Sequence, residues 1–283
     1  MLNNKYLAQS GLLLVTIIWG VTFILVQEAL NDAPPFSFAF LRFGLAFVLT
    51  LLLINSKINS INKNEFIGGL ICGLFLFMGY AFQNFGLMNT TASKSAFITS
   101  VSVLMVPFIL VIFNIQSVSI RKWLAVMLAT IGLYLLLLPG GGGLNLGDIL
   151  TFGCAIAFAI HIIIQDFYIK KKLQLFNFFL IQSGCVTILS LISAYFTESQ
   201  SIMFSDRLIV AILITGILAT FVAFIIMIWA QNILNPTETA IIFAMEPVAA
   251  TLFAIFYANE VLGFWGIIGG TLIFLAVIYG EYK

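Results

Sequence analysis

Residues 8–28 read AQSGLLLVTIIWGVTFILVQE and carry no charge before the final glutamate. A bilayer core about 30 Å thick is crossed by about 20 apolar helical residues that rise 1.5 Å each. This stretch therefore predicts a transmembrane helix. Because many stretches of similar length follow it, we expect it to stay as an anchor and not to be cleaved as a signal peptide.

The composition of the whole chain supports this interpretation. Of its 283 residues, 62% are hydrophobic and 8% are charged, against about 25% charged residues in ordinary soluble domains. Twelve Lys and Arg with eleven Asp and Glu cannot cover a soluble fold of this size, so the remaining apolar surface must face the lipid bilayer. A net charge of +1 gives no field for nucleic acid, which we exclude as a partner.

The polar and Pro/Gly clusters divide the chain into ten apolar stretches. In lipid the backbone polar groups must pair within each segment, which favours helices. We therefore expect an all-α integral membrane protein with ten transmembrane helices. The predicted spans, numbered one to ten, are residues 8–28, 36–54, 66–88, 94–114, 121–138, 148–168, 176–196, 207–231, 237–257 and 262–280.

The basic residues predict the orientation, because Lys and Arg are retained on the cytoplasmic side. With the N-terminus inside, only Lys94 and Arg207 lie on the outer side. The inner segments carry Lys5, Lys57, Lys63, Arg121, Lys122, Lys170, Lys171, Lys172 and Lys283. We expect a multi-pass protein of the cell membrane with both termini in the cytoplasm.

Residues inside the membrane recur at offsets of 138 to 142 positions, which indicates an internal repeat. The pairs are Pro107 and Pro247, Arg42 and Gln182, Gln27 and Gln165, and Trp123 and Trp265. Five spans per copy is an odd number, so the second copy enters the membrane from the opposite side. We predict two inverted five-helix repeats, residues 1–138 and 148–283, joined by an outer glycine-rich linker, residues 139–147.

Ionisable residues inside a membrane are functional candidates, because each costs at least about 2.5–3.5 kcal/mol on insertion scales. Glu246, directly before Pro247, can hold a proton or face a substrate amine; a structural role beside Arg42 or free backbone donors is the alternative. Arg42 can reach a carboxylate or extend to the outer surface. His161, the only histidine, is either a proton-linked cavity residue or a packing residue.

Polar and aromatic side chains in three other spans complete the set of expected substrate-binding residues. They are Phe23 and Gln27 in span one, Tyr80, Gln83 and Asn84 in span three, and Thr99 in span four. Such residues form either the wall of a water-filled path or the hydrogen bonds between helices.

The sequence shows no catalytic constellation and no metal-ligand spacing. The three cysteines, Cys72, Cys154 and Cys185, lie far apart in apolar stretches and predict neither a disulfide nor a metal site. We therefore expect no cofactor and no enzymatic activity.

Several short motifs in this order are similar to those of a known family. They are Trp19-Gly20, Leu41-Arg42-Phe43, the stretch from Ala92 to Pro107, Leu144 to Asp148, Glu246-Pro247-Val248 and Asn259-Glu260. With ten spans and an inverted repeat, the chain resembles the drug/metabolite transporter superfamily, specifically its EamA-type ten-span members. Asn114-Ile115-Gln116 stands where relatives often have a Gly-Glu like Asn259-Glu260, a departure that weakens any paired acidic role at these ends.

The resemblance implies a basket-like bundle of two inverted halves with a central cavity. Spans one, three, four, six, eight and nine would line the cavity, and alternating access would move a small metabolite, often outward. We expect a secondary transporter for amino acids or related solutes, coupled to protons if at all, and acting as a monomer or weak dimer. A membrane enzyme on a lipid-linked substrate, or a channel or receptor, is the alternative.

Overall fold

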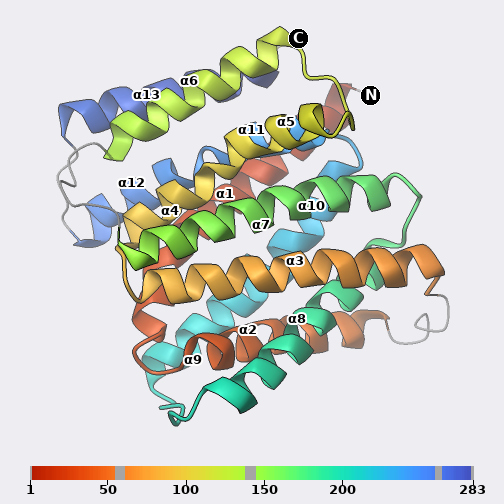
Figure 1. The fold of residues 1–283 in the computed structure, drawn as a ribbon, viewed down its shortest axis with the longest axis vertical. Coiled ribbons are helices and arrows are strands. Elements are labelled where there is room, and N and C mark those ends of the chain that lie inside the picture. Colours follow the sequence, from red (N-terminus) through yellow and green to blue (C-terminus); the bar gives the residue numbers. More distant parts are fainter. Residues whose placement is uncertain (1, 55–60, 138–144, 259–262, 282–283) are drawn as a thin grey trace.

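The computed structural model describes residues 2–54, 61–137, 145–258 and 263–281. Within these ranges the regular secondary structure is entirely helical (Figure 1), which confirms the predicted all-α fold. Residues 139–144, the glycine-rich part of the predicted linker, lie outside the described residues, as do Asn259-Glu260, Lys57 and Lys283.

All ten predicted spans are helical in the described part of the chain. The elements are α1 (Leu2–Ala29), α2 (Pro35–Ile54), α3 (Lys63–Leu87), α4 (Ala92–Ser100), α5 (Ser102–Ile112), α6 (Ile120–Leu137), α7 (Leu146–Ile169), α8 (Leu175–Thr197), α9 (Asp206–Leu213), η2 (Ile214–Val222), α10 (Ala223–Gln231), α11 (Pro236–Phe243), α12 (Glu246–Ala258) and α13 (Phe264–Glu281). Seven helical runs are long and apolar enough to cross a membrane: spans one to four and six to eight. The chain is a multi-pass membrane protein.

Three spans differ from the single α-helices that the sequence predicted. Span four is divided into α4 and α5, and span nine into α11 and α12. Span eight stays continuous from Asp206 to Gln231 but contains a nine-residue π-helix, η2, between α9 and α10. Such irregular backbone is tolerated at membrane depth only where it is buried in protein or lines a cavity.

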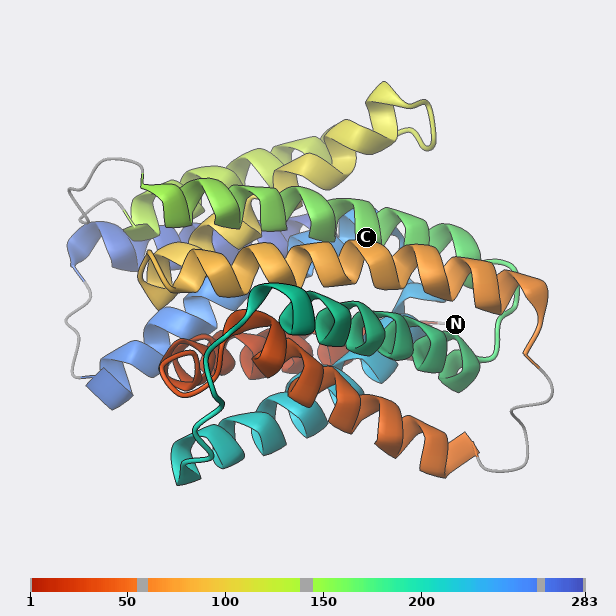
Figure 2. The same cartoon turned by 60° about the horizontal axis from the view of Figure 1, so that its bottom comes forward.

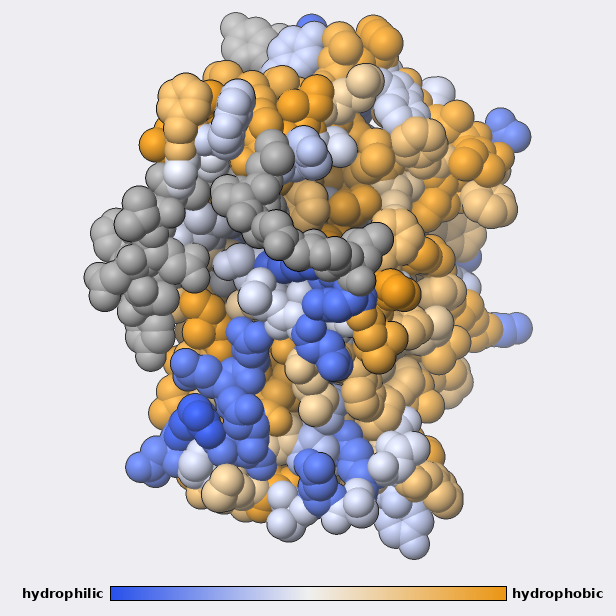
Figure 3. Space-filling model, turned by 60° about the vertical axis from the view of Figure 1, so that its left-hand side comes forward, coloured by the Kyte–Doolittle hydropathy of each residue, from blue (hydrophilic) through white to orange (hydrophobic). Residues whose placement is uncertain are grey.

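Both chain ends lie at the same end of the bundle (Figure 1), as an even number of spans requires. α6 and α13 pack together at one edge, while α3 packs on α7 and α2 packs on α8 (Figures 1 and 2). Large apolar side chains such as Leu52 and Phe196 are more than 60% exposed. Figure 3 shows hydrophobic residues over the right-hand side of this view, whereas hydrophilic residues gather in its lower, left-hand half.

Three helices begin with a capping box that also joins a second helix. The boxes pair Asn62 with Glu65 at α3, Asn145 with Asp148 at α7, and Asn235 with Glu238 at α11. The same carboxylates accept hydrogen bonds from other parts of the chain: Glu65 from the Gln174 backbone N–H at 2.8 Å, Asp148 from Lys94 Nζ at 2.6 Å and Glu238 from Lys5 Nζ at 3.1 Å. Each box therefore fixes where a helix starts and which neighbour it meets.

An ion pair ties the turn between α1 and α2 to the start of α9. Arg207 donates from Nε and Nη2 to the two carboxylate oxygens of Asp32 at 2.8 and 2.7 Å, and Ser205 Oγ donates to the same carboxylate at 2.6 Å. The hydrogen bonds from Arg207 and Ser205 hold the pKa of Asp32 below its ordinary value. This link is therefore charged at neutral pH.

Candidate functional site

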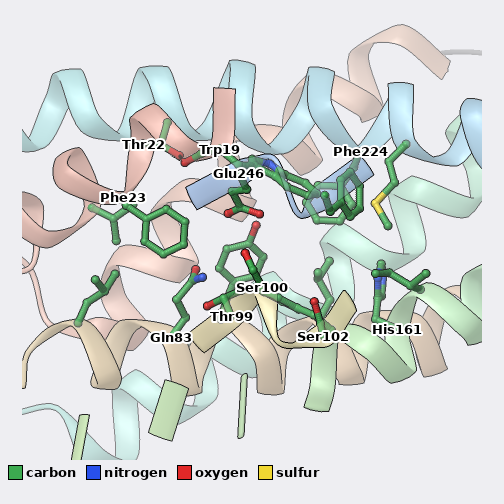
Figure 4. A pocket seen from close by; sticks show the side chains of 18 of the residues that line it. Trp19, Thr22, Phe23, Gln83, Thr99, Ser100, Ser102, His161, Phe224 and Glu246 are labelled. Carbon is green, nitrogen blue, oxygen red and sulfur yellow. Dashed lines mark hydrogen bonds between the residues drawn. The ribbon is translucent and has the colours of Figure 1, made fainter. Parts of the chain in front are cut away.

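A cavity lies inside the bundle where the two divided spans meet (Figure 4). The empty space within it, including the part that opens to solvent, is about 690 Å³, of which about 60 Å³ can hold the centres of water-sized molecules. The lining residues are Trp19, Thr22, Phe23, Val26, Arg42, Leu76, Tyr80, Gln83, Leu87, Thr99, Ser100, Ser102, Phe158, His161, Ile162, Phe224, Met227, Phe243 and Glu246. They come from the six spans that the resemblance implied and also from span two, through Arg42.

The break in span nine coincides with a proline. Pro247 has no amide hydrogen to donate to the carbonyl of Phe243, and α11 ends at Phe243. Glu246 starts α12 immediately before the proline. The end of one half-helix and the start of the next therefore both line the cavity.

The break in span four does not lie at its proline. Pro107 is inside α5, whereas α4 ends at Ser100 and Val101 interrupts the α-helix. Ser100 Oγ donates to the Ala96 carbonyl at 3.0 Å, and such side-chain bonds to the preceding turn bend helices. Span four is thus interrupted at the hydroxyl-rich turn that faces the cavity, before Pro107 is reached.

Glu246 is buried, with 7% of its surface exposed, and its side chain points into the cavity. Figure 4 shows it between Thr22 and Trp19 on one side and Thr99 and Ser100 on the other. Within the described residues, its carboxyl forms no hydrogen bond or ion pair with another side chain. The predicted structural alternative, a pair with Arg42, is therefore not formed.

Arg42 is 3% exposed and turns inward, not to the outer surface. Its Nε donates to Thr220 Oγ1 at 2.7 Å, and its Nη2 donates to the Tyr80 hydroxyl at 3.1 Å. The guanidinium carbon lies 4.5 Å from the centre of the Tyr80 ring, a cation–π contact. All these partners are neutral, so within the described part of the chain no carboxylate pairs with the guanidinium at the cavity wall.

The π-helix η2 explains how Arg42 and Trp19 are held. The Ala219 carbonyl, in the middle of η2, accepts a hydrogen bond from Trp19 Nε1 at 2.8 Å and one from Arg42 Nη2 at 3.4 Å. A π-helix changes the regular ladder of carbonyl partners, which allows a carbonyl to serve side chains of other helices. Span eight thereby fixes two cavity residues from α1 and α2.

Six of the eight expected substrate-binding residues line the cavity: Phe23, Tyr80, Gln83, Thr99, His161 and Glu246. The structure places the other two outside its lining. Gln27 donates to the Thr90 carbonyl at 2.9 Å, and Asn84 donates to the Pro35 carbonyl at 3.1 Å. Gln27 therefore holds the turn between α3 and α4, and Asn84 holds the start of α2.

Sequence reasoning did not include Arg42, Trp19 and Phe224 among the expected site residues. A charge six or seven residues into a span was the available signal for Arg42. Phe224 is one of 29 phenylalanines, so nothing in its local sequence distinguishes it from a packing residue.

Gly20 allows α1 to approach the backbone of α12 beside Glu246. A methyl group on Gly20 would lie 2.7 Å from the Glu246 carbonyl oxygen and 2.8 Å from the Ala250 amide nitrogen. Backbone atoms cannot rotate away, so Gly20→Ala should displace α12 and destabilise the protein by about 1–3 kcal/mol. We expect a lower melting temperature in detergent and reduced transport.

The matched control is Gly44→Ala in α2, where the nearest atom to the added methyl is the Thr187 methyl at 3.6 Å. This is an ordinary van der Waals distance, so its melting temperature should stay close to that of the wild type. Equal melting temperatures for the two variants would show that the contact between α1 and α12 is not tight.

Comparison with known families covers almost the whole chain. The model of the family described as "EamA-like transporter family" matches residues 7–138 and 145–279. The chain belongs to the EamA-like transporter family. This confirms the resemblance seen in the sequence.

The relatives of this EamA-like protein carry transporter names. A protein of Archaeoglobus fulgidus named "Uncharacterized transporter" is 35% identical over 97% of this chain and 86% of its own length. "Uncharacterized transporter YoaV" of Bacillus subtilis is 25% identical, with 96% of each chain covered. The family and these names indicate a transporter and not an enzyme.

A solved crystal structure shares the fold. It superimposes with a TM-score of 0.80 at 14% sequence identity, and the match covers 97% of this chain and 96% of the other. At that identity the likeness shows the arrangement of helices alone.

Proposed function

We propose that this EamA-like protein is a secondary carrier that moves amino acids or related small solutes across the cell membrane by alternating access. In this proposal the protein exports its solute from the cell and acts as a monomer or weak dimer. Protons, if they are coupled to transport, would bind at Glu246 or His161.

One observation carries the proposed substrate class: the same cavity contains the Arg42 guanidinium and the Glu246 carboxyl, and the two do not pair. Charges buried in this way are costly unless a partner neutralises them. A zwitterionic amino acid supplies both partners, because its carboxylate can bind Arg42 and its ammonium group can bind Glu246.

The remaining lining residues would shape the pocket around such a solute. Tyr80 already accepts from Arg42, so its hydroxyl can donate to the same carboxylate. Gln83 and Thr99 add hydrogen-bonding groups, and Phe23 adds an apolar wall. Gln27 and Asn84 would act indirectly, through the segments that they hold.

Alternating access requires two halves that move relative to each other, and the packing supports the proposed inverted repeat of residues 1–138 and 148–283. α3 of the first half packs on α7 of the second, and correspondingly α10 of the second half packs on α1 of the first. Spans four and nine, which occupy the same place in each half, are both interrupted next to the cavity. Carriers built from inverted repeats place interrupted helices at the substrate site.

The orientation with cytoplasmic termini rests on the basic residues. Among the described ones, Lys63, Arg121 and Lys170 lie at helix ends on the same side of the bundle as the N-terminus (Figure 1). The excess of Lys and Arg at this end is the pattern expected for a cytoplasmic face.

Solute counterflow in proteoliposomes tests the proposal. The panel should contain matched triplets: an amino acid, the amine that lacks its carboxylate, and the carboxylic acid that lacks its amine. We expect saturable counterflow with the amino acid and at most weak counterflow with the other two. Flux that never saturates would indicate a channel, and a panel without any counterflow would contradict the proposed function. Efflux from preloaded cells then tests the direction.

A further inference from the structure

A buried chain of three glutamine side chains leads from the cavity residue His161 into the protein. His161 Nε2 lies 3.0 Å from Gln182 Oε1; Gln182 Nε2 donates to Gln165 Oε1 at 3.2 Å; and Gln165 Nε2 donates to Gln231 Oε1 at 2.7 Å. Gln231 Nε2 donates to the Ile162 carbonyl at 3.4 Å. All four side chains are at most 2% exposed.

The last bond fixes the direction of the whole chain. The Ile162 carbonyl can only accept, so Gln231 must turn its amide nitrogen towards it and its oxygen towards Gln165. Gln165 must then donate to Gln231 and accept from Gln182. Gln182 is left with its oxygen facing the imidazole, and that oxygen requires a donor on His161 Nε2.

We propose that Gln182, Gln165 and Gln231 are positioning residues that hold neutral His161 in the Nε2–H tautomer. Nδ1 then carries the lone pair and is the ring nitrogen left to accept a hydrogen bond from a solute in the cavity. Figure 4 shows His161 at the opposite end of this cavity from Phe23. The role in solute binding rests on the proposed carrier function, whereas the tautomer does not.

The reverse tautomer would disrupt this chain. With the hydrogen on Nδ1, His161 Nε2 would need a donor, and all three amides would have to turn over. Gln231 Oε1 would then face the Ile162 carbonyl, an unsatisfied contact between two acceptors that is costly in a buried site. Because hydrogen bonds in series polarise one another, the three amides should act as one unit.

The single histidine makes a direct measurement possible. Protein labelled with 15N-histidine, in lipid nanodiscs at alkaline pH where the ring is neutral, gives imidazole nitrogen signals from one residue. We expect one tautomer, with a protonated Nε2 and a downfield, unprotonated Nδ1. A wild-type spectrum with a protonated Nδ1 would overturn the proposal without any variant.

Gln231→Leu tests the role of the distant amide, because in this chain two other amides separate Gln231 from the imidazole. Loss of the anchor allows Gln165 and Gln182 to turn over, so a second tautomer should appear beside the first. Gln174→Leu, at an exposed position before α8, is the matched control and should keep the wild-type spectrum. A single Nε2–H tautomer in both Gln231→Leu and Gln182→Leu would show that the chain does not position His161.

Counterflow separates this proposal from the proposed function. If the tautomer is as expected and no solute shows counterflow, the carrier function fails and the positioning role stands. If counterflow occurs and the wild-type tautomer is reversed, the positioning role fails alone.

Discussion

Replacing Arg42 by methionine is expected to raise the half-saturating amino acid concentration in counterflow by about tenfold to a hundredfold. Hydrogen bonds to charged groups contribute about 1.5–3 kcal/mol each, and about 1.4 kcal/mol corresponds to one factor of ten in affinity. Methionine keeps an unbranched apolar stem but removes the guanidinium, so the substrate carboxylate loses its only cationic partner in the described cavity lining.

The control must separate lost recognition from lost structure, because Arg42 also joins α2 to Thr220 and Tyr80. The amine that lacks the carboxylate should inhibit Arg42→Met and wild type equally, since it never uses the guanidinium. Arg121→Met, at the start of α6 outside the cavity, should leave counterflow unchanged. An unaltered half-saturating concentration in Arg42→Met would show that Arg42 is a structural residue.

A lysine at position 42 distinguishes charge from geometry. Lysine keeps the positive charge but lacks the planar fork with which arginine contacts a carboxylate and stacks on an aromatic ring. Arg42→Lys should therefore recover part of the lost affinity and not all of it.

The membrane fold was predictable because lipid imposes a single physical constraint along the whole chain. Each span must be apolar for about 20 residues and must satisfy its own backbone, and this leaves a signal that can be counted. Each predicted span therefore overlaps observed helices, from 8–28 within α1 to 262–280, which overlaps α13, although spans four and nine are each divided.

The irregular parts of three spans were less predictable, because their causes are tertiary. Pro247 is a sequence feature that indicates the break between α11 and α12. In contrast, the π-helix η2 contains no proline, and its Ala219 carbonyl serves Trp19 and Arg42 from two other helices. Only the assembled bundle supplies those two donors.

The types of residue in the candidate site were predictable from the sequence, whereas the individual residues that line the cavity were less so. Polar residues inside a membrane are rare enough to be recognised, and Glu246, His161 and Tyr80 do meet in one cavity. Gln27 and Asn84 carry the same chemical signal, yet they bind backbone carbonyls, one in the turn before α4 and one at the start of α2. The sequence identifies an amide in lipid, but it does not say whether the nearest acceptor is a solute or the chain itself.

Replacing Glu246 by glutamine should weaken amino acid counterflow by about tenfold or more, because the change removes the charge that faces the substrate ammonium and keeps the side-chain shape. The carboxylic acid that lacks the amine should bind this variant at least as well as the wild type. The preference between the carboxylic acid and the amine would therefore move in opposite directions in the two variants: towards the acid in Glu246→Gln and towards the amine in Arg42→Met.

The pH dependence gives a second and independent measure of the same residue. In the wild type, protonation of Glu246 removes the negative charge. The apparent affinity for an amino acid should therefore fall as the pH is lowered through the range in which the Glu246 carboxyl takes up its proton. Glu246→Gln cannot titrate there and should show a flat profile over the same range. Glu28→Gln, at the C-terminal end of α1 and outside the cavity lining, should keep the wild-type profile. Wild-type flux of Glu246→Gln at every pH would remove this carboxyl from the mechanism, and with it the reason to expect a zwitterionic solute.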